Sequence, residues 1–495
     1  MSNTQLTTIV LGLDGACWSL IEPWLEAGDL PNLAALREES TWGPLTSQFP
    51  PVTSPNWRCY AAGRNPAKLG VFWWEIVDRQ SRAIRHPRAH DYHTRPLWYE
   101  LAAAGQRAAV INFPTGYPPT PIPGGRFTAG GPGAKDTGFA SPSEWETELR
   151  RKHHYRVHPP GILTSANQVA AQIDDLLALM QSRFDAAFDL LAQGMDFLHI
   201  TLFYINVVQH FCYQDAPTRA AWKMVDHNLG KLVEIAARDR CNLFLMSDHG
   251  CAAVDTVFHA NTWLEREGCL RTEASAVRGL NRVGLSRQKL IGLARCSGLA
   301  PLLRRVIPAS LQRALPNASG TFDKEAKGER IDWTNSRALA SGQGLIYLLT
   351  DPDHSEYESL RDEIAGKLAA LRNPASGEPV ASRILRREEI YNGPFIEQAP
   401  DLIFEQGPGI HTSGGVGHPD IFTPPGKWAA ENVLEGIFLA WGADFTQAGR
   451  VNHTRIIDLA PTILHLHGLP IPDDVDGRAL IGLLLKRYWK PVYCY

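Results

Sequence analysis

The 495-residue sequence lacks paired cysteines, long apolar runs and an excess of charge of either sign. Its eight cysteines stand singly, without a CxxC pair, which argues against a disulfide framework and against a thiolate zinc site. No apolar run approaches the roughly 20 residues of a membrane-spanning helix, and no basic segment precedes the apolar run near the N-terminus. The net charge of −3 favours neither nucleic acid nor a membrane as the main partner. We therefore expect a cytoplasmic protein, and the sequence leaves its oligomeric state open.

The composition is that of a globular protein with a large core, at 44% hydrophobic and 20% charged residues. One stretch differs, because several Arg and Lys residues occur between 279 and 315 without an acidic residue among them. We predict an α/β core over residues 1–270 and 335–495, and an inserted basic helical cap over residues 271–334. The cap would draw in an anionic substrate or rest on an anionic surface; the alternative is a solvated helical face.

Three short apolar runs end directly in polar side chains. They are residues 7–13 before Asp14, residues 197–204 before Asn206 and His210, and residues 242–246 before Asp248 and His249. Runs of this kind are typical of buried parallel strands, and ligands of open α/β sheets bind outside the carboxyl ends of such strands. The pattern predicts a mostly parallel central sheet with helices on both faces. Further strands are predicted at 107–113, 345–349, 401–404 and 436–441, and helices at 31–39, 55–62, 163–193, 217–238, 356–371 and 455–467.

The side chains at these strand ends are candidate metal ligands. Asp248 and His249 offer a carboxylate oxygen and an imidazole nitrogen, which suit zinc or manganese. Asn206 and His210 are four residues apart, so they share one face of a helix. Asp14 is a further candidate, although an Asp at this place also suits a helix N-cap.

Thr53 lies in the proline-rich turn at 49–60, just ahead of a predicted helix. The prolines on both sides restrict the backbone, so they should hold the threonine in one pose. A fixed pose suits a nucleophile. The alternative is an ordinary helix start, with Thr53 or Ser54 as the N-cap.

The chain also carries a series of ordered motifs. They are GLDG at 12–15, PPVTSPNW at 50–57, AGRNPAKLGVF at 62–72, NFPTGYPP at 112–119, SDHG at 247–250, APDLIF at 399–404, GIFLAWG at 436–442, and IDLAPTILHLHGLP followed by DGRAL near the C-terminus. Together they resemble the alkaline phosphatase superfamily, in particular its type I phosphodiesterase and nucleotide pyrophosphatase branch. The resemblance implies an alkaline phosphatase-like fold. It also implies one divalent metal held by Asp14, Thr53, Asp248 and His249, with Thr53 as the nucleophile.

The sequence departs from this family at the second metal. The resemblance implies an Asp, a His four residues later and a late His as ligands of that metal. Here Asn206 stands at the Asp position, His210 is kept, and Asn432 stands at the late His position. Because an amide oxygen is a poorer ligand than a carboxylate or an imidazole, we expect this site to be weak or empty and favour one metal per chain over two. His411 or His418 would be the substitutes for the missing imidazole.

Without a second metal, other groups must stabilise the substrate. Asn206, His210 and Asn432 could donate hydrogen bonds to nonbridging oxygens. Arg58, just over one helical turn after Thr53, and His418 are further candidates for substrate binding, although Arg58 also suits a surface helix position.

From the motifs we predict a metal-dependent hydrolase that cleaves a phosphoester through a covalent Thr53 intermediate. A phosphodiester is the favoured substrate, because one metal matches an ester of low negative charge. Zinc is the expected metal, with manganese and calcium as alternatives, and a small anionic ester is the expected partner. One alternative is a transferase that passes a phospho- or sulfo-group from Thr53 to an acceptor. The other is a non-catalytic binding pseudoenzyme, against which the retained first-site residues argue.

Overall fold

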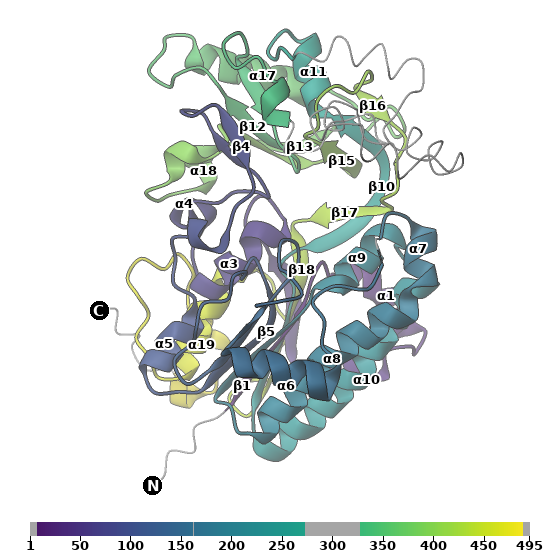
Figure 1. The fold of residues 1–495 in the computed structure, drawn as a ribbon, viewed down its shortest axis with the longest axis vertical. Helices are drawn as coiled ribbons and strands as arrows, with labels where there is room; N and C mark the ends of the chain where they lie inside the picture. The colour runs from purple at the N-terminus through teal and green to yellow at the C-terminus, as the bar shows by residue number, and fades with distance from the viewer. Residues whose placement is uncertain (1–6, 162, 273–326, 489–495) are drawn as a thin grey trace, which may run out of the picture.

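The computed structural model describes residues 7–161, 163–272 and 327–488 (Figure 1). Most of the predicted cap at 271–334, including its basic run, lies outside the described residues. Within the described part of the chain, no helix is long and apolar enough to cross a membrane.

The centre of the molecule is a ten-stranded sheet in which β9, β1, β8, β5 and β6 are parallel neighbours. Antiparallel β18 and β7 flank this block on its two sides, and β2 pairs with β18. The bounds are β1 Thr8–Leu13, β2 Thr41–Thr46, β5 Ala108–Pro114, β6 Arg126–Gly130, β7 Ala140–Ser141, β8 Phe197–Leu202, β9 Asn242–Met246 and β18 Glu435–Gly442. The small strands β19 Gly449–Arg450 and β20 Thr454–Arg455 pair with β2. The predicted strands at 7–13, 107–113, 197–204, 242–246 and 436–441 are thereby confirmed.

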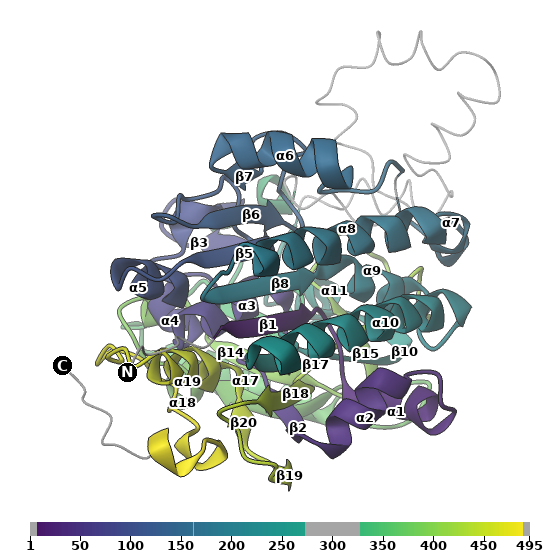
Figure 2. The same ribbon diagram turned by 90° about the horizontal axis from the view of Figure 1, so that it is seen from below.

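Helices cover both faces of this sheet, as the fold prediction requires (Figures 1 and 2). On one face lie α1 Trp18–Glu26, α2 Pro31–Glu38, α8 Ile173–Ala192 and α10 Ala216–Asp239. On the other face lie α3 Thr53–Ala62, α5 Leu97–Ala103 and α19 Leu459–Leu466. The predicted helix at 163–193 is two helices, because α7 Ala166–Ala171 precedes α8.

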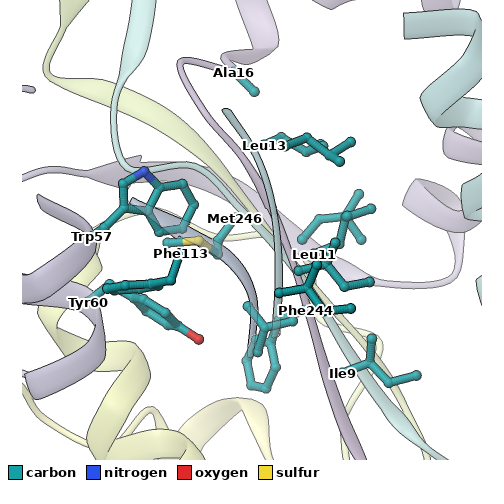
Figure 3. Close-up of a cluster of buried hydrophobic side chains, with 14 of the residues drawn as sticks. Ile9, Leu11, Leu13, Ala16, Trp57, Tyr60, Phe113, Phe244 and Met246 are labelled. Carbon is teal, nitrogen blue, oxygen red and sulfur yellow. The ribbon is translucent and has the colours of Figure 1, made fainter. Parts of the chain in front are cut away.

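The core between the sheet and α3 is aromatic. Trp57, Tyr60 and Phe113 pack on one side of β1, and Leu11 and its neighbours project to the other side (Figure 3). The Trp57 ring crosses β1 at Gly12, where an added Cβ would lie 2.4 Å from the indole. Only glycine allows the helix that carries Thr53 to approach the strand this closely.

A second hydrophobic cluster lies beyond the carboxyl ends of the central strands, in the upper part of Figure 1. It contains the antiparallel sheet β11-β12-β14-β13 and the strands that pair with β10. The bounds are β10 Gly250–His259, β11 Ala338–Ala340, β12 Leu345–Leu348, β13 Ala381–Arg386, β14 Leu402–Gln406, β15 Gly409–Ser413, β16 Phe422–Thr423, β17 Ala430–Val433, α11 Ala260–Arg266 and α17 Tyr357–Ala370. The predicted core of residues 1–270 and 335–495 therefore holds two hydrophobic clusters. β10 follows β9 and β17 precedes β18, so these strands link the two clusters.

Candidate active site

Neighbouring parallel strands bring the predicted first-site ligands together. β1 and β9 are in register with Gly12 opposite Met246, so the residues two positions later, Asp14 and Asp248, emerge side by side. With His249 they form a buried group whose possible ligand atoms all lie within 4.8 Å of one another. The structure thus brings these three side chains together.

Thr53 faces the same group from the first residue of α3. Its Oγ1 lies 3.3 Å from Asp14 Oδ1 and 3.3 Å from His249 Nε2. Val52 precedes α3, and the backbone is non-helical again at Ser54, with φ −104° and ψ 114°. The Thr53 hydroxyl faces Asp14 and His249 and the Ser54 hydroxyl is hydrogen-bonded to Tyr92, so neither side chain is directed at the helix N-terminus. Asn56 stabilises the turn, since its amide donates to the carbonyls of Pro50 at 2.8 Å and Val52 at 3.1 Å.

The donor set fits a divalent cation. His249 Nδ1 donates to the Gly250 carbonyl at 2.9 Å, which leaves the Nε2 lone pair facing the carboxylates. Asp248 Oδ2 lies 3.3 Å from that nitrogen and has no hydrogen-bond partner among the described residues. Several hydrogen-bond acceptor atoms therefore face one another, and the Thr53 hydroxyl can donate a hydrogen bond to only one of them. A metal ion satisfies all of them at once.

Burial and mutual repulsion perturb these groups when no cation is bound. Burial, followed by the charge of Asp248, raises the pKa of Asp14 well above its usual range. Burial raises the pKa of Asp248 to about 8, and it lowers the pKa of His249. A bound cation reverses this balance because it favours the charged carboxylates. Trp57 Nε1 donates to Asp14 Oδ2 at 2.8 Å and Gly15 N to Asp248 Oδ1 at 3.2 Å, which orients both carboxylates.

The predicted second half-site also assembles, but from neutral groups. Asn206 and His210 lie on α9 Phe203–Phe211, and Asn432 lies on β17. His210 Nδ1 donates to the Ala430 carbonyl at 2.7 Å, which leaves Nε2 available. The Oδ1 atoms of both Asn residues are buried without a hydrogen-bond partner in the described part of the chain. Amides can present either their oxygen or their NH₂ to a ligand.

Thr53, Asn206, His210 and Asn432 together line one cavity of about 830 Å³. Asp14, Asp248 and His249 are fully buried and do not line it, so the first half meets the cavity through Thr53. Aromatic side chains form much of its remaining wall. They are Trp73, Trp74, Phe203 and Trp428, joined by His86. The turn at 130–135, which resembles a phosphate loop only superficially, contributes Pro132 and Gly133 to the same wall.

Two sequence candidates, Arg58 and His418, do not line this cavity. Arg58 donates to the Thr115 side chain at 3.1 Å and to its carbonyl at 2.7 Å, and it stacks on Tyr92. Five residues after Thr53, it points to a different face of α3 and is absent from the cavity wall. His418 stacks on His259 with ring centroids 3.8 Å apart, also outside that wall.

Sequence reasoning missed several residues that line the cavity. Glu431 is 5% exposed and accepts a hydrogen bond from His411 Nδ1. The Trp428 ring lies 4.3 Å from the His210 ring and 5.6 Å from the His411 ring, measured between centroids. The only signal for either residue was its nearness to Asn432 in the sequence. His411, a candidate imidazole substitute, does line the cavity, with Nδ1 committed to Glu431.

Residues 8–428 match the family model of type I phosphodiesterase / nucleotide pyrophosphatase. The chain belongs to this family. It is therefore a phosphoester hydrolase of the alkaline phosphatase superfamily. None of the curated proteins compared with the chain matches it.

Solved structures share the fold at low sequence identity. A phosphonoacetate hydrolase from Sinorhizobium meliloti 1021, in complex with phosphonoformate, is similar with a TM-score of 0.57 and 16% identity, over 92% of this chain and 94% of that chain. The murine ectonucleotide pyrophosphatase / phosphodiesterase 5, in an inactive form with AMP, is similar with a TM-score of 0.51 and 13% identity, over 97% and 100%.

Proposed function

We propose that this family member is a metal-dependent phosphodiesterase that forms a covalent intermediate on Thr53. The observation that carries the proposal is the position of Thr53 Oγ1, 3.3 Å from both Asp14 Oδ1 and His249 Nε2 at the wall of the cavity. A hydroxyl placed among metal ligands is suited to nucleophilic attack. The inactive form of the murine relative carries a threonine-to-alanine substitution, which agrees with such a role.

The proposed metal site consists of Asp14, Thr53, Asp248 and His249. We propose zinc, which suits this mixture of carboxylate and imidazole, with manganese and calcium as alternatives that an assay can separate. When bound, the cation would lower the pKa of the Thr53 hydroxyl and so make it a competent nucleophile.

The surrounding protein fixes the direction of attack. Asn56 holds the turn, and Trp57 holds Asp14 on the side away from the cavity. Thr53 is 3% exposed, so its side chain has little freedom to leave this pose. Phosphorus must therefore approach from the cavity, with the leaving oxygen directed away from Thr53.

The neutral half of the site favours a diester over a monoester. A diester carries one negative charge at neutral pH, so one cation and hydrogen-bond donors suffice for its nonbridging oxygens. Asn206 and Asn432 are placed to donate these hydrogen bonds, each of which contributes about 3 kcal/mol in a preorganised site, whereas neutral His210, with its proton on Nδ1, presents only the accepting Nε2 to the cavity. The aromatic wall offers contact area for an apolar or planar substituent of the ester.

A panel of substrates tests the proposal. Phosphodiesters, phosphomonoesters, a sulfate ester and phosphonoacetate are each assayed with zinc, manganese and calcium. We expect diesters with zinc to give the highest kcat/KM, and a signal confined to monoesters would contradict the proposed substrate. Thr53→Ala should lower kcat by at least about a thousandfold. Thr53→Ser is the matched control, because it keeps a hydroxyl and should keep part of the activity.

Trapping the intermediate tests the nucleophile directly. Acid quench during turnover should leave a phosphoryl adduct on the peptide that contains Thr53. Turnover without an adduct, together with full activity of Thr53→Ala, would assign the attack to water.

A further inference from the structure

The cavity contains a carboxylate and imidazole pair that the proposed metal chemistry does not use. His411 on β15 and Glu431 on β17 both line the cavity, and His411 Nδ1 donates to Glu431 Oε2. Both strands pair with β10, with His411 opposite Val257 and Glu431 opposite Ala252. The backbone of both partners is therefore fixed by the same strand.

Hydrogen bonds hold Glu431 as a carboxylate. Its Oε1 accepts from the Asn432 backbone at 2.8 Å and from the Gln343 side chain, which is itself held by Gln406 at 3.1 Å. Burial raises the pKa of Glu431, but the charge and hydrogen bond of His411 outweigh burial and place the pKa below its usual range. The carboxylate is thus oriented by its neighbours and directed at one imidazole.

This arrangement selects one nitrogen of His411 for chemistry. Because Nδ1 is bound to Glu431, Nε2 is the nitrogen left for the cavity. An imidazole whose Nδ1 is held by a buried carboxylate is the arrangement of a general acid or base. His210 differs, because its Nδ1 donates to a backbone carbonyl and not to a carboxylate, and burial lowers its pKa more than the charge of the nearby Glu431 raises it.

We propose that His411 is the general acid that protonates the leaving oxygen and that Glu431 is its positioning residue. This inference rests on the proposed function, since it needs an ester attacked by Thr53. The deprotonated Thr53 oxygen, whose proton has gone to solvent, forms a bond to phosphorus. The bond to the leaving oxygen breaks, and the proton on His411 Nε2 moves to that oxygen, which departs as an alcohol.

The second step restores the pair. Neutral His411 Nε2 takes a proton from the water that attacks phosphorus, and the Thr53 oxygen leaves and takes a proton from solvent. Glu431 keeps its charge throughout. The pair thereby supplies a proton to the leaving oxygen. In a two-metal site, the second metal ion would stabilise the negative charge on that oxygen instead.

Leaving-group dependence tests this assignment. A series of methyl aryl phosphodiesters is hydrolysed by the zinc-loaded wild type and by His411→Gln. We expect kcat/KM for the 4-nitrophenyl ester to change by only a few fold, because this leaving group needs no proton. For the unsubstituted phenyl ester we expect a loss of about a hundredfold or more. Glu431→Gln should shift the series in the same direction to a smaller extent, because glutamine can still accept from Nδ1 but carries no charge.

Control variants show whether a change in the series comes from the role of His411 or from another cause. His227→Gln changes an exposed histidine on α10 and should leave the whole series unchanged. Equal losses on all esters in a folded His411→Gln, or no loss on any, would overturn the role of His411. If Thr53→Ala abolishes turnover while His411→Gln gives a flat series, only this inference fails. If the wild type cleaves none of these diesters, the proposed function fails and this inference with it.

Discussion

The two halves of the site differ in charge, because one contains carboxylates and the other contains amides. On one side, Asp14 and Asp248 leave the ends of β1 and β9 as buried carboxylates beside His249. On the other side, Asn206 and Asn432 present neutral amides beside His210. The first half holds more negative charge than its own hydrogen bonds can satisfy. The three side chains of the second half hold none, and the neighbouring Glu431 carboxylate is hydrogen-bonded to His411. We therefore expect a cation in the first half alone.

This difference indicates how one ion can serve where related enzymes use two. In the proposed account, a metal would supply positive charge beside Thr53, and the amides would donate hydrogen bonds to the substrate. The His411 and Glu431 pair, which lines the same cavity, would supply a proton.

The largest test of the comparison removes a charged ligand. Asp248→Asn removes one of the two carboxylates of the first half and leaves only Asp14. We expect zinc affinity to fall by at least about a hundredfold, measured by competition with a chelator, and activity to fall with it. Asp239→Asn, an exposed change at the end of α10, is the control and should bind zinc as the wild type does. Unchanged affinity in Asp248→Asn would show that the first half is not the metal site.

A smaller effect is expected in the neutral half. Asn206→Ala removes one proposed donor to a nonbridging oxygen, so kcat for the diester should fall by about a hundredfold. Zinc affinity should stay the same, because the amide is not a ligand in this account. A parallel loss of zinc, followed in the same titration, would make Asn206 a ligand and remove the distinction between the halves.

The smallest expected effect is a change in the free energy of unfolding with pH. Burial raises the pKa of Asp248 from an ordinary 3.8 to about 8 in the metal-free protein. The folded state then binds a proton that the unfolded state has lost, so stability is fully present below about pH 4 and falls as the pH rises to about 8. The slope contributed by one such group is at most about 1.4 kcal/mol per pH unit.

Denaturant unfolding of chelator-treated protein between these pH values measures this slope. Asp248→Asn should make it shallower, because the amide does not titrate and only Asp14, whose pKa burial also raises, remains. Zinc should remove the slope by favouring the carboxylates. An equally steep slope in Asp248→Asn would assign the pH dependence to other groups.

The half-site at the strand ends could be predicted from the sequence because its signal is local. A buried parallel strand is a continuous apolar run, and the first polar residue after it must emerge at the carboxyl edge of the sheet. Asp14 is the first polar residue after β1, and Asp248 follows β9 after Ser247. The two emerge side by side because β1 and β9 are neighbours in register. The central sheet and its two layers of helices could be predicted for the same reason.

The rest of the site depends on long-range contacts that no local pattern carries. Glu431 and Trp428 lie on or beside a strand of four residues that pairs with β10, far away in the sequence. Arg58 is a case in which sequence proximity misleads. It is five residues from Thr53, and residues at this separation point to different faces of a helix. The second hydrophobic cluster likewise depends on β10 crossing from one sheet to the other.

The number of zinc ions per chain tests the central claim most directly. After dialysis against zinc and removal of free metal, elemental analysis of the full chain should give about one zinc per protein. Asp248→Asn should give close to none under the same conditions, while Asn206→Ala should still give about one. A value near two for the wild type, falling to about one in Asn206→Ala, would contradict the account, because the amide half would then hold a metal of its own.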